Sequence, residues 1–493
     1  MSNKKRIIVV GGGTSGLVSA HNLSQDYDVL VLERSKRSSY PIWFKIPLLI
    51  GLLFQSNKQK YVRKLDIKLN NRNIPFFQSE VLGGASIING CVHVFGVRKH
   101  WIEFTNKLKI NLREIENNYH DLYSTNHLDT RKINIKDVCP DEIDRAFFEA
   151  LSEKNFKTTD MTYADEEGFG VVSNTVGRFF RTSVMNLINR NKFKIKLNKN
   201  VEGFVYSKDK IIGVKTQDET FHADYILINA GVIDTVKLFL KEKKNLMKIT
   251  KNNHSLESIG HGVKDHTNLR INVRATRNIG SLNEINNSFP KKFILLLRHI
   301  LGIPTLMRGT GATSAIHLDL DNDGVVDTRI QLLRFSENDR AGSDGSLFDS
   351  SNPGFSFSIT QINPSSSGQI NSNEVNPRYL HSKKDMKILV KAVSFCLNLL
   401  ESRHLKKYVL KIENDDLIRS DVEKYISNNF YSGYHLIGGL SMLVDEKLRF
   451  KGLKNLFISD ASIFDKHLAS NIHASVVLVS DSFSKNFFDW FDS

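Results

Sequence analysis

The sequence predicts an α/β protein with two parts, a parallel sheet flanked by helices and an antiparallel sheet with helices of its own. The first part is indicated by a continuously apolar stretch, Ile7–Val10, followed by a glycine-rich turn, a helical pattern and a second strand. A strand that is apolar at every position is typical of a parallel sheet covered on both faces. The second part is indicated by the strand-like segments "TSAIHLDL", "DTRIQLLRF" and "FSFSIT", and by the helical spacing of apolar residues in "SKKDMKILVKAVSFCLNLLESR".

Composition and charge exclude several classes of protein. With 40% hydrophobic and 25% charged residues, the chain is globular, and its 493 residues allow roughly two to four domains. The net charge of +15 comes from Lys and Arg scattered over the whole length, which indicates a basic solvated surface and no nucleic-acid module. Three distant cysteines, Cys91, Cys139 and Cys396, offer no metal knuckle and fit a reducing compartment. Because the first strand begins at Arg6, it leaves no room for a signal peptide, and we predict a cytoplasmic protein.

Two apolar stretches, Pro41–Phe54 and Phe293–Pro304, are too short and too often interrupted to span a bilayer. We expect both to be buried in the core or to line a cavity. The alternative is a peripheral contact with a membrane surface, which Lys291, Lys292 and Arg298 would support because basic amphipathic segments lie in membrane interfaces.

The turn after the first strand has the G-x-G-x-x-G spacing, with Gly11, Gly13 and Gly16. The first glycine of this motif permits a tight turn, the second lets the backbone approach a pyrophosphate, and the third allows the helix to pack closely on the sheet. The next strand, "DVLVLE", ends at Glu33, where a carboxylate can accept hydrogen bonds from an adenosine ribose. Glycines alone are weak evidence, but with this strand–turn–helix context they predict a Rossmann-like dinucleotide site, for either FAD or NAD.

A second cluster of small residues lies in "VLGGASIINGCVHVFG", where main chain can lie against a flat ligand. This segment resembles the flavin-contacting signature of the glucose-methanol-choline (GMC) oxidoreductases, written GGSSAINGMVYVRG. "ADYILINAGVIDTVKLFL" resembles that family's second signature, with Asp234-Thr235-Val236 in place of Ser-Pro-Gln, and "IGHGVKDHTN" resembles its VGxNLxDH element. The run from Tyr434 to Phe488 resembles the HPVGTxxMG, NLxVxDAS and final-helix elements, so the resemblance covers nearly the whole chain.

The resemblance implies that the dinucleotide is FAD. In members with a tethered flavin the linking histidine of the first signature stands where this chain has Ile88, so we predict non-covalent FAD. No resident metal is expected. The residues expected to bind the cofactor are Gly11, Gly13, Thr14, Ser15, Gly16, Glu33, Gly83, Gly84, Ser86, Asn89, Gly90, Val201, Ala230, Gly231, Asp460, Ala461 and Asn471.

The segment "YSGYHLIGGLSM" sets His435 among glycines and apolar residues. Taken alone, such a histidine is more often a hydrogen-bonded core residue. The resemblance places His435 at the family's catalytic histidine and Asn471 at its second catalytic residue, which is His or Asn. His473 lies nearby and is an alternative candidate for that second role. The other interpretation of His473 is a packing role at the start of a helix. Gly439 replaces the Thr of HPVGT, which removes a hydroxyl beside the histidine.

Because the cofactor motifs occur at both ends and in the middle of the chain, we predict a discontinuous FAD-binding domain. Its expected segments are residues 1–98, 195–275 and 430–493, with a small meander of strands leading back into the nucleotide sheet. The substrate domain is expected at 99–194 and 276–429, with the antiparallel sheet and helices.

The loop "DLDNDGVVD" carries Asp319, Asp321, Asp323 and Asp327 around Gly324 and is similar to calcium-binding acidic loops. Position 12 of an EF-hand would fall on Ile330, where a bidentate carboxylate is required. We therefore expect a polar hairpin between two strands, with calcium as the alternative.

The resemblance implies an FAD-dependent oxidoreductase that acts on the CH–OH group of an alcohol, polyol or sugar. His435 would take the hydroxyl proton with the help of Asn471 while the flavin takes the hydride. The alternative is an FAD-containing lyase or decarboxylase of the same fold, without net alcohol oxidation. The electron acceptor, a quinone, a carrier protein or oxygen, is not selected by the sequence.

Overall fold

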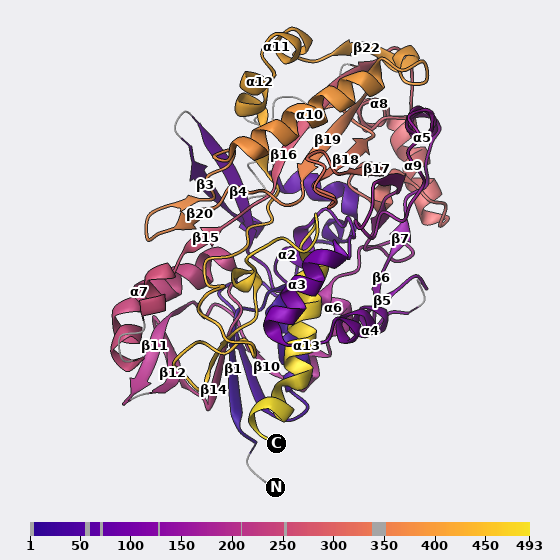
Figure 1. Cartoon of the computed structure of the whole chain (residues 1–493). Coiled ribbons are helices and arrows are strands. Elements are labelled where there is room, and N and C mark those ends of the chain that lie inside the picture. Colours follow the sequence, from indigo (N-terminus) through magenta and orange to yellow (C-terminus); the bar gives the residue numbers. More distant parts are fainter. Residues whose placement is uncertain are drawn as a thin grey trace.

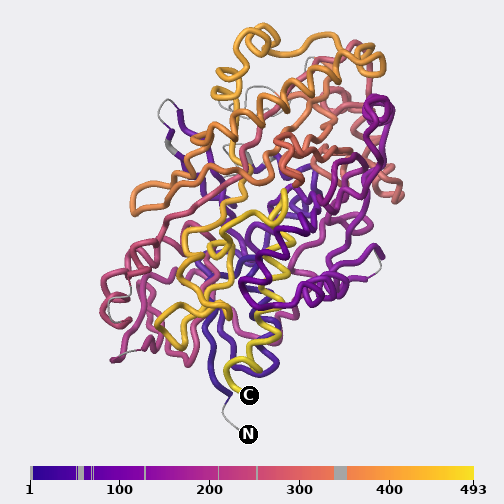
Figure 2. Tube along the Cα trace, in the orientation of Figure 1, coloured from indigo at the N-terminus to yellow at the C-terminus, as the bar shows by residue number. Residues whose placement is uncertain are grey.

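The computed structural model describes residues 4–54, 60–69, 72–126, 129–208, 210–250, 254–337 and 352–493. Figure 1 shows two sheet-containing parts, with both chain termini at the end that carries β1 and β14. The C-terminal segment, yellow in Figure 2, runs from the middle of the molecule to the end that carries the termini. The mixed α/β fold with a parallel and an antiparallel sheet confirms the predicted fold class.

The parallel sheet has five strands in the order β10-β2-β1-β14-β24. Its strands are parallel throughout and come from distant parts of the chain: β1 (Arg6–Val10), β2 (Asp28–Leu32), β10 (Lys194–Lys196), β14 (Tyr225–Ile228) and β24 (Leu456–Ile458). The central positions of β1 are fully buried, as predicted from its unbroken apolar run. This sheet places the ends of β1, β2 and β14 at one edge, where parallel sheets bind ligands.

Helices and a meander complete this part of the molecule. Helix α1 follows β1 directly and packs against the C-terminal helix α13, while α7 packs on the predicted antiparallel meander. The bounds are α1 (Thr14–Leu23), α7 (Val232–Ile249), α13 (His473–Phe491), β11 (Val201–Ser207), β12 (Lys210–Thr216) and β13 (Thr220–His222).

The antiparallel sheet has seven strands in the order β22-β16-β19-β18-β17-β8, with β23 paired to β16. Its long neighbours β17, β18 and β19 are the three segments from which an antiparallel sheet was predicted. The strands are β8 (Gly168–Val171), β16 (Thr267–Ala275), β17 (Ala312–Leu318), β18 (Thr328–Leu333), β19 (Gly354–Gln361), β22 (Val409–Ile412) and β23 (Tyr431–Ser432).

One face of this sheet is covered by helix α10 (Lys383–Leu400), the predicted long helix (Figure 1). Alternate strand residues such as Ile271, Ile330 and Phe357 pack with this helix in a second hydrophobic core. The smaller helices α5 (Glu142–Glu153), α11 (Asp415–Ser420) and α12 (Val422–Asn429) lie around it. The opposite face of the sheet therefore stays available for the polar residues that alternate with the core residues.

Two segments pack differently from the predicted domain ranges. Strand β16 falls within the range 195–275 expected for the FAD-binding domain, yet it pairs with β19 and β22 of the antiparallel sheet. Helices α3 (Arg98–Leu108) and α4 (Leu112–Leu122) fall within the range expected for the substrate domain, yet Trp101 and Ile115 belong to the same core as the parallel sheet. The predicted domain bounds stay a prediction.

The first apolar stretch forms two 3-10 helices, η1 (Ile42–Lys45) and η2 (Pro47–Phe54). Phe44 is fully buried with Tyr61 in a small core, and Leu48, Ile50 and Leu53 face a cavity. The expectation of core or cavity lining is confirmed for this stretch. The adjacent hairpin consists of β3 (Val62–Lys68) and β4 (Asn73–Ser79).

The second apolar stretch forms α9 (Phe289–Ile300), for which the expectation of burial is wrong. Its apolar side chains face solvent, with Phe289 81% and Ile300 60% exposed, and within the helix only His299 is fully buried. His299 anchors the helix by a hydrogen bond between its Nε2 and the Phe179 carbonyl oxygen (2.9 Å). Periodicity reveals an apolar segment but does not reveal whether another element covers it.

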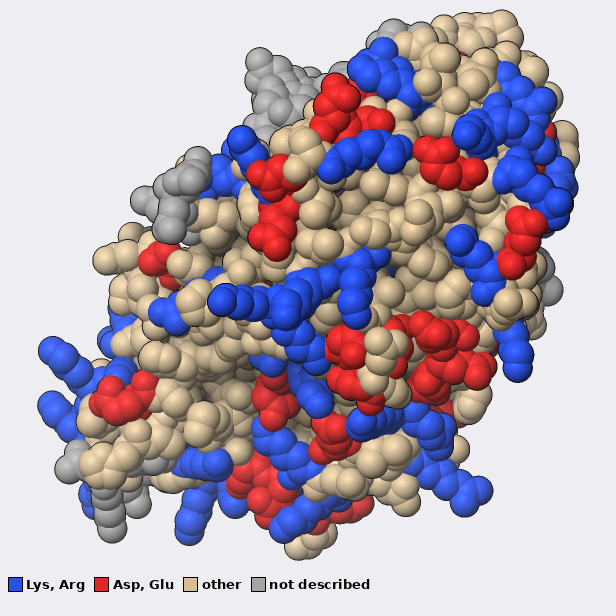
Figure 3. All heavy atoms as spheres, turned by 45° about the horizontal axis from the view of Figure 1, so that its top comes forward, with Lys and Arg blue, Asp and Glu red and all other residues tan. Residues whose placement is uncertain are grey.

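The remaining described elements are short. They are α2 (Ala85–Ile88), α6 (Val184–Leu187), α8 (Leu282–Asn286), β5 (Tyr123–Ser124), β6 (Ile133–Asn134), β7 (Lys136–Asp137), β9 (Ser173–Asn174), β15 (His261–Val263), β20 (Gly368–Ile370) and β21 (Val375–Asn376). Within the described ranges, no helix combines the length and apolar character needed to cross a membrane. On the face shown in Figure 3, Lys and Arg are interleaved with Asp and Glu, as expected from charges scattered along the sequence.

Candidate active site

A cavity of about 820 Å³ lies between the two sheets. One wall comes from the turn after β1, from the end of β2 and from the turn after β14, and the opposite wall comes from β16, β18 and β19. Most of the residues expected to contact a cofactor lie on its surface: Gly11, Gly13, Thr14, Ser15, Glu33, Gly84, Asn89, Gly90, Val201, Ala230, Gly231, Asp460, Ala461 and Asn471. Gly16, Gly83 and Ser86 lie behind this surface.

The glycine turn after β1 has the geometry that an approaching anion requires. Gly11 has a φ of +104°, and a Cβ there would lie 2.4 Å from the Asn229 carbonyl oxygen. A Cβ at Gly16 would lie 1.9 Å from the Gly11 oxygen, so the third glycine serves helix packing. Gly13 has no other atom within 4 Å of its Cβ position and opens onto the cavity at the start of α1. These are features of a site for pyrophosphate at a helix N-terminus.

Glu33 is held in place at the end of β2 by two backbone hydrogen bonds. Its Oε2 accepts from the Gly12 N–H and its Oε1 from the Ser35 N–H, both at 2.7 Å. Burial raises the pKa of this carboxyl. Glu33 lines the cavity, and each of its oxygens keeps a further lone pair that could accept from a ribose hydroxyl.

The first signature lies directly against the glycine turn. The Gly83 N–H donates to the Gly12 oxygen (2.8 Å), and a Cβ at Gly84 would lie 2.8 Å from the Gly13 Cα. The buried Ser86 hydroxyl donates to the Gly83 oxygen, which gives Ser86 a role in the turn itself. The Asn89 Oδ1 accepts from Arg181 Nη1 (3.0 Å) and from the Cys91 N–H (3.2 Å), so Asn89 offers its amide N–H groups to a ligand.

The turn after β14 explains why the second signature departs from the family pattern. Asp234 forms ion pairs with Arg34 and Arg63, and Thr235 donates to the Asp460 Oδ2 (2.6 Å). Asp460 also accepts from the Gly231 N–H (2.8 Å), so this carboxylate joins the turn to the end of β24. Asp234 and Thr235, which differ from the family's second signature, therefore form ion pairs and a hydrogen bond, respectively, within this chain.

His435 and Asn471 meet on the cavity wall, with 3.5 Å between the Asn471 Nδ2 and the His435 Nε2. The other ring nitrogen, Nδ1, lies 2.9 Å from the Nδ1 of His266. If Nε2 is to accept a proton, Nδ1 of His435 must carry one and donate it to His266. The geometry thus suits a neutral His435 whose free lone pair faces Asn471 and the cavity.

A buried network supports this histidine. Asp265 accepts from the His435 backbone N–H (2.8 Å) and from the hydroxyls of Ser432 and Tyr379. His467 lies 2.9 Å from the His435 carbonyl oxygen through its Nε2. Burial lowers the pKa of His435 to about 4 and raises the pKa of Asp265 to about 6. His435 is therefore neutral, and able to accept a proton, at physiological pH.

The two glycines after His435 are required by the backbone. Gly438 and Gly439 have φ of +86° and +100°, and a Cβ at Gly439 would lie 2.6 Å from Val236 Cγ2. The change from Thr to Gly at position 439 thus accompanies a left-handed backbone. His473, the alternative to Asn471, also lies on the cavity wall, and burial lowers its pKa to about 4.

Sequence reasoning missed the polar residues of the opposite wall. They project from the face of the antiparallel sheet that α10 leaves uncovered: Asn268, Arg270, Arg329, Gln331, Ser358 and Thr360. The available signal was the alternation within "TRIQLL", where Arg329 and Gln331 share one face and Ile330 and Leu332 share the other. Arg34, Lys237 and Lys241, which also line the cavity, were missed as well.

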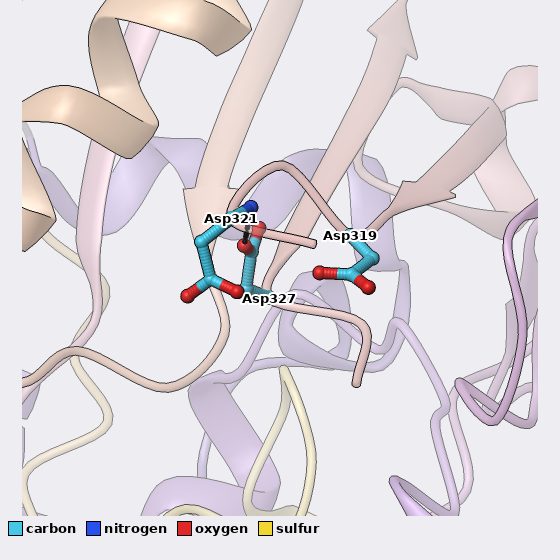
Figure 4. A group of neighbouring side chains, drawn as sticks. All are labelled: Asp319, Asp321 and Asp327. Atoms are coloured by element: carbon cyan, nitrogen blue, oxygen red, sulfur yellow. Dashed lines mark hydrogen bonds between the residues drawn. The ribbon is translucent and has the colours of Figure 1, made fainter. Parts of the chain in front are cut away.

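The acidic loop is the polar hairpin turn expected between β17 and β18 (Figure 4). Carboxylate oxygens of Asp319, Asp321 and Asp327 lie within 4.8 Å of one another. The Asp327 carboxylate accepts from the Asp321 N–H (2.9 Å), and Lys384 forms ion pairs with Asp321 and Asp323. Protein donors thus neutralise part of this cluster.

Comparison with known proteins identifies similar sequences and structures. Residues 360–480 match the family model described as GMC oxidoreductase. The chain is 22% identical to an alcohol dehydrogenase [acceptor] of Pseudomonas putida and 21% identical to a glucose dehydrogenase [FAD, quinone] of Drosophila pseudoobscura pseudoobscura. Each alignment covers 96% of this chain, with 94% and 85% of the relative. A crystal structure of formate oxidase superposes with a TM-score of 0.83 at 15% identity, over 99% of both chains.

Proposed function

We propose that the chain belongs to the GMC oxidoreductases, a family of FAD-dependent enzymes, and that it oxidises the CH–OH group of an alcohol, polyol or sugar. The observation that carries this proposal is the pair His435 and Asn471, which faces a cavity whose other wall is a dinucleotide-binding turn. The glycine turn, Glu33 and the first signature together fit FAD, since their backbone leaves open the surfaces that a pyrophosphate and a flat ring need.

The proton transfer falls to His435. The substrate hydroxyl lies between His435 Nε2, which accepts its proton, and the Asn471 amide, which orients its oxygen. His266 holds the second ring nitrogen, and Asp265 holds the backbone, so the imidazole is positioned before the substrate arrives. FAD, when bound, supplies the acceptor for the hydride that leaves the carbinol carbon. The product is a carbonyl compound.

Anaerobic mixing with a panel of alcohols, polyols and sugars tests this function. Oxidation bleaches the flavin absorbance in the absence of oxygen, whereas a lyase or decarboxylase turns over with its flavin still oxidised. The named relatives are dehydrogenases, and the named structure is an oxidase, which favours oxidation over the lyase alternative. Turnover of a substrate without bleaching would contradict the proposal.

We propose that FAD is bound without a covalent link. Ile88 lies on the cavity wall at the position where tethered members carry a histidine, and an alkyl side chain cannot form that bond. Acid precipitation should therefore release the flavin into the supernatant. Flavin that stays with the precipitated polypeptide would contradict this.

We also propose that the protein is cytoplasmic and binds peripherally to an anionic membrane. The α9 surface consists of exposed apolar side chains with a basic margin. Its apolar members are Phe180, Phe289, Phe293, Ile294, Leu296, Leu297, Ile300, Leu301 and Ile303. Monomeric proteins rarely expose large apolar patches.

The charges around the α9 surface favour a lipid surface over a second copy of the chain. Lys292 and Arg298 lie on the helix, together with Lys291, which already pairs with Glu284. Lys45 lies against Phe180, and Arg178 lies beside Gly302. A second copy docked by the same patch would bring these positive charges together, whereas an anionic headgroup layer neutralises them. A membrane quinone is accordingly the acceptor we favour over oxygen.

Sedimentation with vesicles tests the membrane contact. Binding is expected with phosphatidylcholine vesicles containing phosphatidylserine, weaker binding with phosphatidylcholine alone, and loss of binding in Phe293→Ser/Ile294→Ser. Leu410→Ser, at an exposed apolar residue of β22, is the matched control. A parent protein that dimerises in solution without binding vesicles, and that the double variant makes monomeric, would contradict the proposal.

A further inference from the structure

Arg329 is a buried cation, and its Nε–Nη2 edge is buried as well and unpaired among the described residues. Its side chain is 1% exposed and lies on the cavity wall. Nη1 donates to the Ser470 hydroxyl oxygen (3.1 Å) and contacts the Asn471 Oδ1 (3.5 Å). Nε and Nη2 have no hydrogen-bond partner within the described part of the chain. These two N–H groups form the parallel edge with which a guanidinium binds a carboxylate through two bonds.

No carboxylate among the described residues pairs with Arg329. Burial lowers the pKa of its guanidinium to about 9, so the group remains a cation at neutral pH. A buried charge without a counter-ion is costly, by several kcal/mol in proteins as an order of magnitude. Arg270, on the same wall, differs because Glu337 neutralises it. The chain therefore keeps one uncompensated positive charge beside its candidate catalytic pair.

The strand register places this charge within an ordered polar surface. Thr360 of β19 lies between Asn268 of β16 and Arg329 of β18. In the next row, two residues along, Ser358 lies between Arg270 and Gln331. All six side chains line the cavity. Beside the cation, this wall thus offers hydroxyl and amide groups suited to a polar substrate.

We propose that the substrate is a hydroxy carboxylate and that Arg329 binds its carboxylate through Nε and Nη2. This rests on the oxidation proposed above. Asn471 contacts Arg329 through Oδ1 and His435 through Nδ2, so the carboxylate and the reacting hydroxyl bind on either side of one amide. In the reaction the O–H proton goes to His435 Nε2, the C–H electron pair goes to FAD as hydride, and the alcohol carbon becomes the carbonyl of an oxo acid.

Matched acidic and neutral alcohols test the substrate class. Anaerobic flavin reduction by lactate, glycerate and gluconate is compared with reduction by lactamide, glycerol and sorbitol. The parent should favour at least one acid over its neutral partner by about 10² or more in rate at low concentration. In Arg329→Met this preference should disappear, since the carboxylate loses its charged partner. Reduction by the neutral alcohols should slow much less than reduction by the acids, since Arg329 acts on them only through its contact with Asn471.

Two further variants serve as controls. Arg329→Lys keeps the charge without the paired edge and should recover part of the preference. Arg274→Met removes an exposed partner of Glu413 from the same sheet, outside the cavity, and should keep the full preference. Flavin content and circular dichroism verify that each variant is folded.

A binding measurement separates failure of this inference from failure of the proposed oxidation. Acetate and propionate should perturb the flavin absorbance of the parent and of Arg274→Met, but with about tenfold or weaker affinity in Arg329→Met. This result would support the carboxylate site even if no alcohol reduces the flavin. Absence of any anion effect in the parent would overturn it. Equal losses for acidic and neutral alcohols in Arg329→Met, with an altered flavin reduction potential, would overturn it too and assign Arg329 to the flavin.

Discussion

The two walls of the cavity are built in different ways. The wall after β1, β2 and β14 is largely backbone, in which Gly11 and Gly84 have left-handed φ values and no room for a side chain. The wall from β16, β18 and β19 consists of side chains that project from one sheet face, such as Arg329 and Gln331. A wall built from backbone requires glycine at particular positions, whatever the detailed chemistry of the ligand. A wall built from side chains can have different residues for different substrates. The first is therefore visible in a sequence pattern and the second is not.

The largest effect is expected on the backbone wall. Gly11→Ala places a Cβ 2.4 Å from the Asn229 oxygen on a residue with φ of +104°, so the turn must move. We expect most of the FAD to be lost and activity with it, as measured by the flavin-to-protein ratio after gel filtration. Gly324→Ala, at φ +80° in the acidic turn with open space around it, is the control that should keep its flavin. A fully flavinated Gly11→Ala protein would show that this wall tolerates side chains.

Where the walls meet, loss of the histidine should remove catalysis but leave the cofactor bound. His435→Ala should slow anaerobic flavin reduction by about 10² to 10⁴, the usual contribution of a positioned acid–base group. Stopped-flow absorbance separates this step from reoxidation. If the flavin of His435→Ala is reduced at the parent rate, His435 has a structural role, and His473 becomes the candidate base.

A smaller effect is expected for Asn471→Ala. The amide orients the hydroxyl and contacts the base without taking the proton, so about a tenfold loss is expected, as for one neutral hydrogen bond. The same stopped-flow assay measures it. A loss as large as that of His435→Ala would mean that Asn471 and His435 act as one unit.

Sequence reasoning covered the parallel sheet, the glycine turn, the meander and the long helix α10, because each has a period or a turn chemistry of its own. It also predicted the hairpin at the acidic loop. The resemblance to an FAD-dependent family came from motifs rich in glycine, because a backbone wall requires glycine at fixed positions. The roles assigned to His435, Asn471 and the cofactor-binding residues stay predictions until tested.

What could not be predicted depends on contacts between distant segments. The apolar stretch at Phe293 looks the same in sequence whether it is buried or exposed, and only the absence of a covering element among the described residues distinguishes the two. Likewise, β16 follows a cofactor motif in the chain but pairs with the antiparallel sheet. Arg329 is one basic residue among 68 in the sequence, and its burial beside Asn471 appears only after folding.

The pH dependence should reveal how strongly the site is desolvated. With the pKa of His435 near 4, the base stays unprotonated on acidification, so flavin reduction should fall less than about threefold from pH 8 to pH 5. A shallow step near pH 6 is expected as Asp265 gains a proton. The steep loss should come below pH 5, measured by stopped flow in a constant-ionic-strength buffer. A steep loss centred near 6.5 would indicate a solvated histidine.

The smallest effect is expected at the acidic turn between β17 and β18, which belongs to the antiparallel sheet but lies outside the cavity. Lys384 and backbone N–H groups already compensate its carboxylates, so neither a chelator nor added Ca²⁺ should move the melting temperature of the parent. Lys384→Ala should cost no more than about 1 kcal/mol, because half-exposed ion pairs contribute little, and should leave flavin reduction unchanged. A rise of several degrees with Ca²⁺ would instead identify the turn as a cation site, since a ligand that binds only the folded state stabilises it. The side chains of this turn would then form a second ligand site on the antiparallel sheet. Ligand binding by side chains, as distinct from backbone, would in that case not be confined to the cavity.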